Sequence, residues 1–486
     1  MIHRYQKKGL NFVLDVNSGA VHLLDDISYA VSGLLDENMG DTCPQSIIDA
    51  LPDYTADEIR EAYDELYELK KAGQLFAQDD YIDVSRYIPV NAPVKALCLH
   101  VAHDCNLRCQ YCFASTGDFG QGRKIMPPEI AKKAIDFVIA RSGVRHNIEV
   151  DFFGGEPLMA WDTVTQTVDY ARSLEEKYNK KFRFTITTNG LLLDEDKRKY
   201  INENMDNCVL SLDGRREVND EFRKTVAGTG SYDTIVPKFK ALVDERDPNL
   251  DYYARGTFTS HNLDFANDVL SIADAGLDYY ARGTFTSHNL DFAEDVLSIA
   301  DAGFDRLSVE PVTADPGCGY DLTEDDLPKI EAEYDRLTDI MLERKKEGKP
   351  FTFFHFMVDL DQGPCVVKRL RGCGAGYEYV AVTPDGDIYP CHQFVGKDEF
   401  KQGSVLDQSF NMDIAQKFAG MNIYSRPKCQ KCWAKFYCSG GCSAANYNMN
   451  HDMNDSYDLG CEMERKRLEC AIYLKAMDKI CANQSK

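Results

Sequence analysis

Three closely spaced cysteines in the first quarter of the chain limit its possible folds and chemistry more than any other feature. Cys105, Cys109 and Cys112 form a C-x3-C-x2-C pattern directly after a predicted strand. Three thiolates at this spacing can bind three irons of a [4Fe–4S] cluster and leave the fourth iron open to another ligand. A structural zinc site needs four ligands, and only Cys98 and His103 lie near enough in the sequence to help complete one. The triad therefore predicts an iron–sulfur cluster with one open coordination position.

A second, larger group of cysteines lies in the last quarter of the chain. It begins with C-x12-G-x4-C and continues as C-x2-C-x5-C-x3-C with one cysteine beyond, at Cys373, Cys391, Cys429, Cys432, Cys438, Cys442 and Cys461. Seventeen cysteines are many for a protein of a reducing compartment, where such clusters bind metals more often than they form disulfides. A pair of zinc ribbons would also use C-x2-C pairs. The upstream triad favours iron–sulfur clusters here as well.

The composition is that of a soluble protein with no affinity for nucleic acid. The 486 residues carry a formal net charge of −24, which opposes binding to phosphate backbones. This charge either keeps the surface solvated or attracts a basic peptide partner. No apolar run is long enough for a membrane span, and the first residues lack the apolar stretch of a signal peptide. We expect a cytoplasmic protein with two or three domains.

The order of the predicted elements indicates an α/β fold with a smaller module before it and a Cys-rich region after it. Between Val94 and Val312, predicted strands alternate with amphipathic helices, as in a parallel sheet or barrel. The N-terminal residues predict a small winged helix that ends in a strand or hairpin at 74–82. We expect a winged-helix-like module at residues 1–88 and the α/β domain at 89–315. A helical linker follows at 316–364, and the Cys-rich domain with a closing helix occupies 365–486.

A near-identical repeat lies inside the predicted α/β domain. Asp251–Gly276 recurs as Asp278–Gly303, an offset of 27 residues, and the only difference is Asn267 against Glu294. Such close identity indicates a recent duplication or an assembly error, because structural repeats normally diverge. Each copy is one strand followed by one helix. One copy should complete the barrel and the other should be an inserted unit, and the sequence leaves open which is which.

The cysteine triad, with an aromatic residue before its last cysteine, resembles the radical S-adenosylmethionine (SAM) superfamily. Further motifs follow successive predicted strands: GGEP at 154–157, TTNG at 187–190 and SLDG at 211–214. They share the edge where parallel barrels keep their active sites. The resemblance implies a partial (β/α)6 barrel whose open iron binds SAM.

The same resemblance implies which side chains contact SAM. Glu156 matches the residue that receives the SAM amino group, and either Arg255 or Arg282 matches the one that meets the SAM carboxylate. SLDG matches the motif that contacts the ribose. The expected SAM-binding residues are Phe113, Gly154, Gly155, Glu156, Asn189, Ser211, Asp213, Arg255, Arg282 and Glu310.

The downstream cysteine pattern resembles SPASM domains, which hold auxiliary clusters in many peptide-modifying radical SAM enzymes. The resemblance implies three [4Fe–4S] clusters, with three cysteines for the SAM-binding cluster and eight for two auxiliary clusters. By family pattern, Cys373, Cys391 and Cys442 bind the first auxiliary cluster. The second is bound by Cys429, Cys432, Cys438 and Cys461. Cys365 either closes the first auxiliary cluster or leaves one iron open for a substrate thiol.

The simplest interpretation of the other six cysteines is that they are buried small apolar residues. They are Cys43, Cys98, Cys208, Cys318, Cys470 and Cys481.

Over nearly its full length the chain is most similar to maturases of six-cysteine peptides, which install a thioether between Cys and the α-carbon of Thr. The resemblance implies reductive cleavage of SAM, with electrons from a flavodoxin- or ferredoxin-type donor. It also implies that the N-terminal module binds the leader of a Cys-rich precursor peptide as an added strand. A structural cap or dimerisation arm is the alternative for that module. His392 follows Cys391 where sulfatase-maturing relatives carry Asp, which argues against oxidation of Ser or Cys.

Three other functions remain open at the level of sequence. The same cofactors could support a carbon–carbon cross-link or an epimerisation. A zinc-ribbon scaffold could bind peptides without catalysis. The repeat could also disable the barrel and leave a protein that only binds its peptide.

Overall fold

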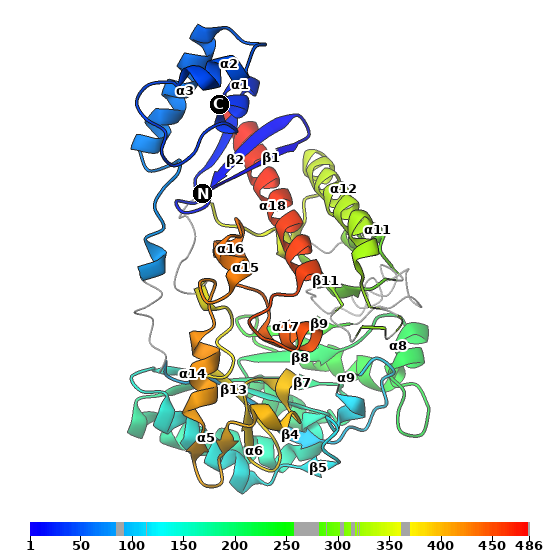
Figure 1. Cartoon of the computed structure of the whole chain (residues 1–486). Helices are drawn as coiled ribbons and strands as arrows, with labels where there is room; N and C mark the ends of the chain where they lie inside the picture. Colours follow the sequence, from blue (N-terminus) through cyan, green and yellow to red (C-terminus); the bar gives the residue numbers. More distant parts are fainter. Residues whose placement is uncertain are drawn as a thin grey trace. The chain divides into compact units, whose positions relative to one another are not determined.

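The computed structural model divides the chain into two compact units (Figure 1). Unit 1 comprises Met1–Ile88, His355–Gly372 and Met421–Lys486, and unit 2 comprises Pro89–Phe354 and Cys373–Gly420. The structure describes residues 1–83, 92–112, 114–256, 281–287, 289–301, 306–312, 316–317, 319, 321–360 and 370–484. Within these residues no helix combines the length and apolarity needed to cross a membrane.

Unit 1 begins with a three-stranded antiparallel sheet and three helices. The strands pair in chain order as β1 (Ile2–Lys7), β2 (Leu10–Asp15) and β3 (Val21–Leu24). The helices are α1 (Asp26–Ser32), α2 (Gln45–Ala50) and α3 (Ala56–Lys71). Thr55 and Glu58 form a capping box that begins α3. Ile59, Tyr63 and Leu66 recur at helical spacing along α3 and are buried in the core of this module.

Two parts of the N-terminal prediction need correction. Strand β1 was not expected, and it forms because its backbone pairs along its whole length with β2. The strand or hairpin expected at 74–82 is absent from residues 74–82 of the structure, and 81–83 are helical instead. Leu75 is buried in the core beside α3, and the Asn17 side chain donates to the carbonyl of Ala77 at 2.8 Å. This segment therefore contributes to the core through its side chains and not through backbone hydrogen bonds to a neighbouring strand.

The C-terminal helix of unit 1 packs against the N-terminal sheet. This helix is α18 (Asp458–Gln484), and the His3 ring bonds to the Glu469 carboxylate at 2.9 Å. The rings of Phe12 and Tyr473 meet edge to face. A further cluster joins the sheet to the cysteine-rich segment through Val16, Leu370, Ile423, Cys429 and Phe436. Val16, which directly follows β2, and Cys429 thus belong to one hydrophobic cluster.

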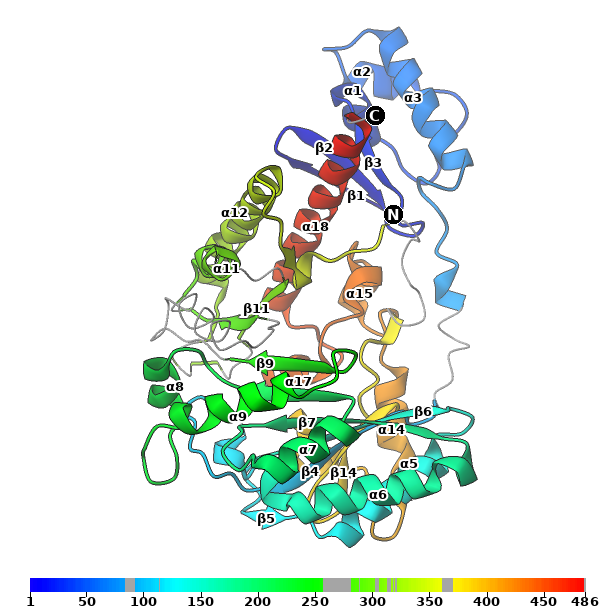
Figure 2. The same cartoon turned by 180° about the vertical axis from the view of Figure 1, so that it is seen from behind.

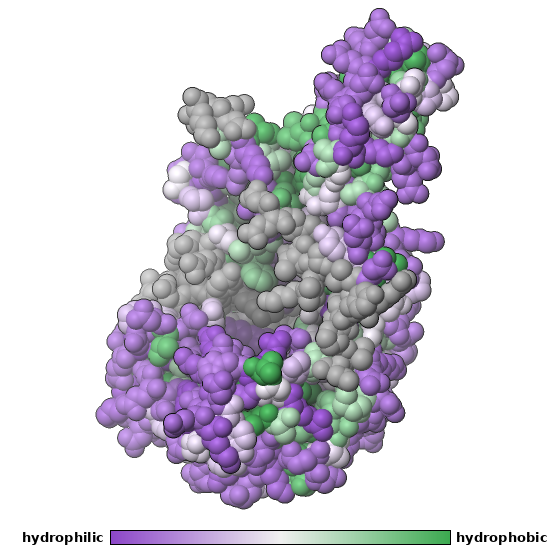
Figure 3. Space-filling view, turned by 90° about the vertical axis from the view of Figure 1, so that its left-hand side faces the viewer, coloured by the Kyte–Doolittle hydropathy of each residue, from purple (hydrophilic) through white to green (hydrophobic). Residues whose placement is uncertain are grey.

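Unit 2 contains the parallel strands predicted for the α/β domain, and the α/β fold class is confirmed. Five parallel strands pair in the order β4 (Ala96–His103), β6 (Asn147–Gly154), β7 (Lys181–Thr188), β8 (Asn207–Ser211) and β9 (Asp251–Arg255). The helices between them are α5 (Pro128–Arg141), α6 (Trp161–Tyr178), α7 (Glu195–Asn204), α8 (Arg216–Phe222) and α9 (Tyr232–Asp244). Helices α5, α6 and α7 lie along one face of the strands (Figure 2). The face of unit 2 seen in Figure 3 is mainly hydrophilic, with hydrophobic residues in small separate patches.

Strands from the Cys-rich region extend this sheet beyond β4. Strand β13 (Tyr379–Val382) pairs parallel to β4. It is followed by an antiparallel series, β14 (Asp387–Tyr389), β15 (Gly403–Ser404) and β16 (Ser409–Phe410). Cys373 and Cys391 therefore belong to unit 2, whereas the cysteines from Cys429 onward belong to unit 1.

The two copies of the repeat place their strands in different sheets. The first copy supplies β9, which pairs with β8. The second supplies β10 (Ala281–Phe285), which pairs parallel to β11 (Arg306–Pro311), and β12 (Thr352–Phe353) follows. Within the described residues each copy thus pairs with its own neighbour in the chain. The helix of the second copy, α11 (Phe292–Asp301), packs on α12 (Leu327–Lys346), where Glu294 forms an ion pair with Arg336.

Candidate functional site

The loop that carries the cysteine triad begins at the C-terminal end of β4. Two backbone bonds fix it to the segment after α8: Arg108 N–H donates to Lys224 O at 2.7 Å, and Gln110 N–H donates to Phe222 O at 3.2 Å. Leu107 is fully buried and forms a bridge to Thr225. The loop is therefore held by tertiary hydrogen bonds, although it has no regular secondary structure of its own.

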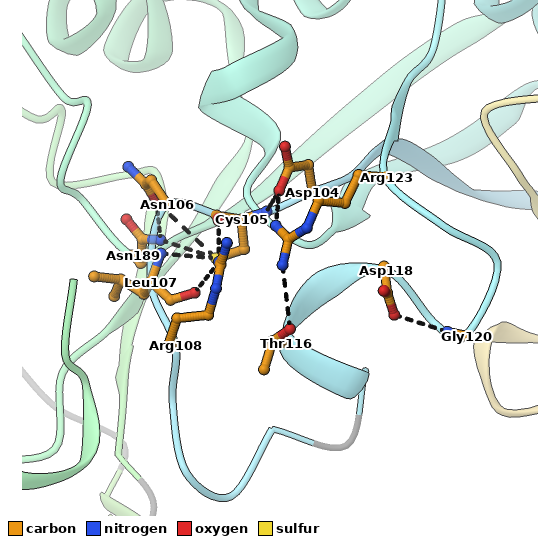
Figure 4. Close-up of polar contacts among 10 residues, drawn as sticks. All are labelled: Asp104, Cys105, Asn106, Leu107, Arg108, Thr116, Asp118, Gly120, Arg123 and Asn189. Carbon is orange, nitrogen blue, oxygen red and sulfur yellow. Dashed lines mark hydrogen bonds and ion pairs between the residues drawn. The ribbon is translucent and has the colours of Figure 1, made fainter. Parts of the chain in front are cut away.

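Polar groups converge on Cys105 (Figure 4). The Leu107 N–H donates to its Sγ at 3.4 Å, and the Asn189 side-chain amide donates to the same atom at 3.6 Å. The carboxylate of Asp104 accepts from the Cys105 N–H at 2.8 Å and forms an ion pair with Arg123. Donors directed at this sulfur stabilise a thiolate, as a metal ligand requires.

The three thiols of the triad lie near enough to influence one another. Burial raises the pKa of Cys105 to about 12, the nearby Glu156 carboxylate adds to the rise, and Cys109 and Cys112 contribute further. Burial also raises the pKa of Cys109. A bound metal displaces the proton from such a thiol outright. Among the described residues no three ligating side chains converge on one metal ion, but a cubane cluster binds each thiolate to a different iron.

Two glycines at the end of β6 allow the cysteine loop to lie directly on the strand. Gly154 has φ of +124°, and a Cβ on it would stand 2.2 Å from the carbonyl oxygen of Ala102. A Cβ on Gly155 would stand 2.1 Å from the carbonyl oxygen of Asp104. Any side chain at either position would push the loop away, so the GGEP motif is required for close packing as well as for any contact with SAM.

Glu156 lies at the centre of the site and is only 1% exposed. Its carboxylate accepts from Leu158 N–H at 3.0 Å, from the Thr188 hydroxyl at 2.7 Å and from Asn189 N–H at 2.7 Å. Burial raises its pKa to about 7, while these three bonds oppose the rise. Three of its roughly four acceptor positions are filled, so one remains for a ligand such as an amino group.

Asp213, expected at the SAM ribose, already has two protein partners. It is fully buried, accepts from the Tyr111 hydroxyl at 2.5 Å and pairs with Arg223 Nε at 2.9 Å. Tyr111 lies between Cys109 and Cys112, so this network braces the cysteine loop. The sequence did not indicate Arg223, because its role depends on a fold that brings α8 beside the loop.

The remaining expected SAM contacts are distributed over several strand ends. Ser211 and Arg255 are opposite each other in the β8–β9 register. Glu310 is half-buried on β11, where it faces Thr284 of β10. Arg282 lies on β10 opposite Ser308, but its side chain and the whole of Phe113 are outside the described residues.

Three histidines lie near the site, and the sequence predicted none of them as a residue that binds SAM. His100 Nδ1 and His103 Nε2 are 3.0 Å apart, and both residues are buried against Phe119. The His392 ring packs on Phe153 with ring centroids 5.6 Å apart. Burial lowers the pKa of His392, and the positive charge of Arg255 lowers it further. The LHVAH sequence before the triad was the only available signal for the first two.

The cysteines of unit 1 surround a buried guanidinium. Cys429 lies on α15 (Pro427–Gln430), Cys438 ends α16 (Lys435–Cys438), and Cys461 lies on α18. Burial raises the pKa of Cys438 to about 12 and that of Cys461 to about 11. Arg426, which precedes α15, is 2% exposed. A [4Fe–4S] cluster with thiolate ligands is an anion, so this combination of thiols and buried positive charge fits it.

The exposure of the remaining cysteines differs from one to the next. Cys373 is exposed and Cys391 half-buried in unit 2, while Cys365 and Cys318 are outside the described residues. Cys98, Cys208 and Cys470 are buried, which agrees with their expected role as small apolar residues. The same expectation is wrong for Cys481, which is exposed near the end of α18, and Cys43 is only half-buried. No described cysteine forms a disulfide.

Comparison with known families identifies two domains. Residues 99–251 match the model of the Radical SAM superfamily, and residues 373–433 match the SPASM model, an iron–sulfur cluster-binding domain. The first match ends where the repeat begins. The chain therefore carries a radical SAM domain followed by an SPASM domain.

Individual relatives extend the similarity over most of the chain. A cysteine-type anaerobic sulfatase-maturating enzyme from Clostridium novyi is 23% identical over 377 residues, which is 74% of this chain and 90% of the relative. The radical SAM cyclopropyl synthase TigE from Paramaledivibacter caminithermalis is 28% identical over 199 residues, 38% of this chain and 40% of the relative. The solved structure of native anSMEcpe with bound AdoMet matches with a TM-score of 0.56 and 20% identity, over 81% of this chain and all of that one. This last likeness concerns the fold alone.

Proposed function

We propose that this radical SAM and SPASM protein is a peptide maturase that installs a thioether between Cys and the α-carbon of Thr in a ribosomally made, Cys-rich peptide. The observation that most strongly supports this proposal is the loop of Cys105, Cys109 and Cys112, which is anchored at the C-terminal end of β4. Glu156 and Asn189 reach the same edge from the ends of β6 and β7. Parallel α/β proteins keep their active sites at this edge.

The described residues supply binding and orientation for the cofactors. The triad would hold the SAM-binding cluster, and the eight downstream cysteines would hold two auxiliary clusters. When bound, the reduced cluster and SAM supply a 5′-deoxyadenosyl radical able to abstract hydrogen. Glu156 offers one acceptor position for the SAM amino group. Arg255 offers a cation for the carboxylate, and Ser211, its partner in register, can reach the same ligand.

The N-terminal sheet offers an edge for the leader of the precursor peptide. In the described residues β3 pairs on one side only, with β2. Leu23 on β3 is 41% exposed, which is high for a large apolar side chain. A peptide strand added to this edge would gain backbone hydrogen bonds and cover Leu23. The net charge of −24 favours a basic leader.

His392 favours a thioether over the oxidation of Ser or Cys. Its pKa is lowered by burial and by Arg255, so the imidazole is neutral where sulfatase-maturing relatives carry an Asp carboxylate. The similarity to a cyclopropyl synthase is consistent with a ring-forming radical reaction. For each thioether the peptide loses a hydrogen atom from carbon and a proton from sulfur, and the remaining electron leaves through an acceptor.

Anaerobic reconstitution tests the proposal. The full chain is expected to bind about twelve irons in three [4Fe–4S] clusters, to yield 5′-deoxyadenosine with SAM and dithionite, and to remove two hydrogens per bridge from a Cys-rich peptide. The matched control is C109A, which should retain the auxiliary clusters and form no 5′-deoxyadenosine. Zinc without iron in the purified chain would support the non-catalytic scaffold instead.

Alkylation of the product separates the competing modifications. A thioether removes the Cys thiol from reaction with iodoacetamide. A carbon–carbon cross-link shows the same mass loss but leaves the thiol reactive, and epimerisation leaves the mass unchanged. A reactive thiol in the product would therefore contradict the thioether assignment without contradicting SAM cleavage.

A further inference from the structure

Arg426 is a buried cation without a carboxylate partner. Its side chain is 2% exposed, and within the described residues it forms no ion pair with Asp or Glu. Nη1 donates to the carbonyl of Gly440, and Nη2 donates to the Ser443 hydroxyl at 3.1 Å. A buried charge that lacks an opposite charge is strongly unfavourable, so this guanidinium calls for an anion.

The unused donor of Arg426 identifies where that anion belongs. Its Nε is buried, and no acceptor among the described residues takes its hydrogen. The side chain lies among the thiols of Cys429, Cys438, Cys442 and Cys461, which are the groups that act electrostatically on it.

The backbone around Arg426 is shaped to keep the guanidinium in place. Gly440 has φ of +85°, and a Cβ at this position would stand 2.2 Å from Arg426 Nη1. Only glycine fits a positive φ and this close approach together. The turn between Cys438 and Cys442 is thus built around the arginine as well as around the cysteines.

Arg465 provides an internal comparison. Its Nη1 is 3.8 Å from Cys432 Sγ, but it forms an ion pair with Glu462 and its side chain is 29% exposed. Its charge is already compensated and partly solvated. Of these two arginines, Arg426 is the one whose charge is uncompensated among the described residues.

We propose that Arg426 is the counter-charge of the auxiliary cluster held in unit 1, donating Nε–H to a cluster or ligand sulfur and holding the reduction potential of that cluster high. This rests on the proposed function, which supplies the cluster. Hydrogen bonds to sulfur and net charge are the main protein controls of cluster potential. A nearby cation favours the reduced state, because reduction adds negative charge.

The experiment uses the full chain with C105A, C109A and C112A, so that only auxiliary clusters form. Iron content and an EPR-monitored redox titration are compared for this parent and for R426Q, R426K and R465Q. R426Q should lower the potential by at least a tenfold change in the reduction equilibrium, which is 59 mV for a one-electron couple. R426K keeps the charge and loses the planar donor, so its shift should be smaller but measurable. R465Q should shift least.

The outcomes separate this inference from the function beneath it. A parent that binds no iron overturns the proposed auxiliary clusters. A parent with clusters and an unchanged potential in R426Q overturns only the role of Arg426, as does an R465Q shift equal to that of R426Q. If R426Q does not fold, the test depends on the reduction potential of R426K. A potential in R426K equal to that of the parent would then overturn the inference.

Discussion

The two copies of the repeat differ at one residue only, yet their strands have different partners. In the first copy the residues DYYAR form β9 and pair with β8, whereas in the second copy the residues ARGTF form β10 and pair with β11. The shared sequence DYYARGTF therefore contains pairing segments for both neighbours. The difference shows that chain connectivity selects the partner, because the first copy follows α9 and the second precedes β11. A single copy could in principle pair on both edges and join the two sheets.

The largest effect is expected at the arginine that the copies share. Arg255 lies opposite Ser211 and close to His392, whereas Arg282 lies on the strand that pairs with β11. Arg255 is exposed in the structure, and a SAM carboxylate bound to it would exclude water from the pair. R255M should then lower the rate of 5′-deoxyadenosine formation roughly a thousandfold, since losing one partner of a desolvated charge pair costs about 2–5 kcal/mol. R282M should stay within about threefold, within the usual scatter of such effects. Equal losses in both variants would mean that both copies contribute to the site.

The second-largest expected effect is on how the free energy of unfolding depends on pH, and it comes from a buried aspartate in α11. Asp295 is 6% exposed, and burial raises its pKa to about 7, with Asp291 and Glu333 adding to the rise and Asn289 opposing it. The unfolded pKa is about 3.9, so the contribution of Asp295 is fully present below pH 4 and is lost as pH rises through 7. D295N should stabilise the protein at pH 8 by about 4 kcal/mol and have little effect at pH 4.

Calorimetry at both pH values measures this difference. The control is D268N, the counterpart in the first copy, which lies outside the described residues. If D268N and D295N have the same pH profile, the two aspartates occupy equivalent environments and the comparison between the copies fails at this position.

Removing one copy tests whether a single strand can serve both neighbours. Deletion of residues 251–277 leaves one intact unit between α9 and β11. SAM cleavage should persist, because the DYYARGTF sequence of the remaining copy contains the segments that pair with β8 and with β11. Deletion of 278–304 is the matched variant and differs only in keeping Asn267 and Leu277 in place of Glu294 and Phe304. An unfolded product from both deletions would show that each copy is needed.

The smallest effect is expected from the one position at which the copies differ. Glu294 pairs with Arg336, and their side chains are 49% and 41% exposed. An exposed pair contributes about 0–1 kcal/mol, so E294Q should lower the free energy of unfolding by less than about 1 kcal/mol. N267E in the first copy is the control. Denaturant titration would contradict this view if E294Q cost several times more.

Local patterns predicted most of the elements, and long-range contacts account for the errors. The amphipathic helices expected between the strands of the α/β domain form, among them α5, α6 and α9, because helical periodicity and turn residues act over a few positions. Strand β1 was missed because its pairing with β2 and its packing on α18 are not visible in six residues. The segment 74–82 reads as a strand by composition, but Leu75 is buried in a helical core.

The candidate site shows the same division. The spacing of Cys105, Cys109 and Cys112 and the glycines of GGEP were readable, because cluster ligation and close packing demand those residue types. The sequence did not predict that Asp213 and Arg223 hold Tyr111 in place. It also did not predict that Arg426 is buried among cysteines. Each depends on segments far apart in the chain whose approach is set by the whole core.

The sequence by itself determined the chemistry that the chain can support, since thiol spacing and strand-end motifs are local requirements of a cluster and its ligand. It also determined the α/β class through the order of its strands and helices. Only the tertiary structure decided which copy of the repeat pairs with which strand, and that Val16 after β2 packs in one cluster with Cys429. Identical segments can make either contact, so the choice depends on the free energy of the assembled core and not on the segment alone.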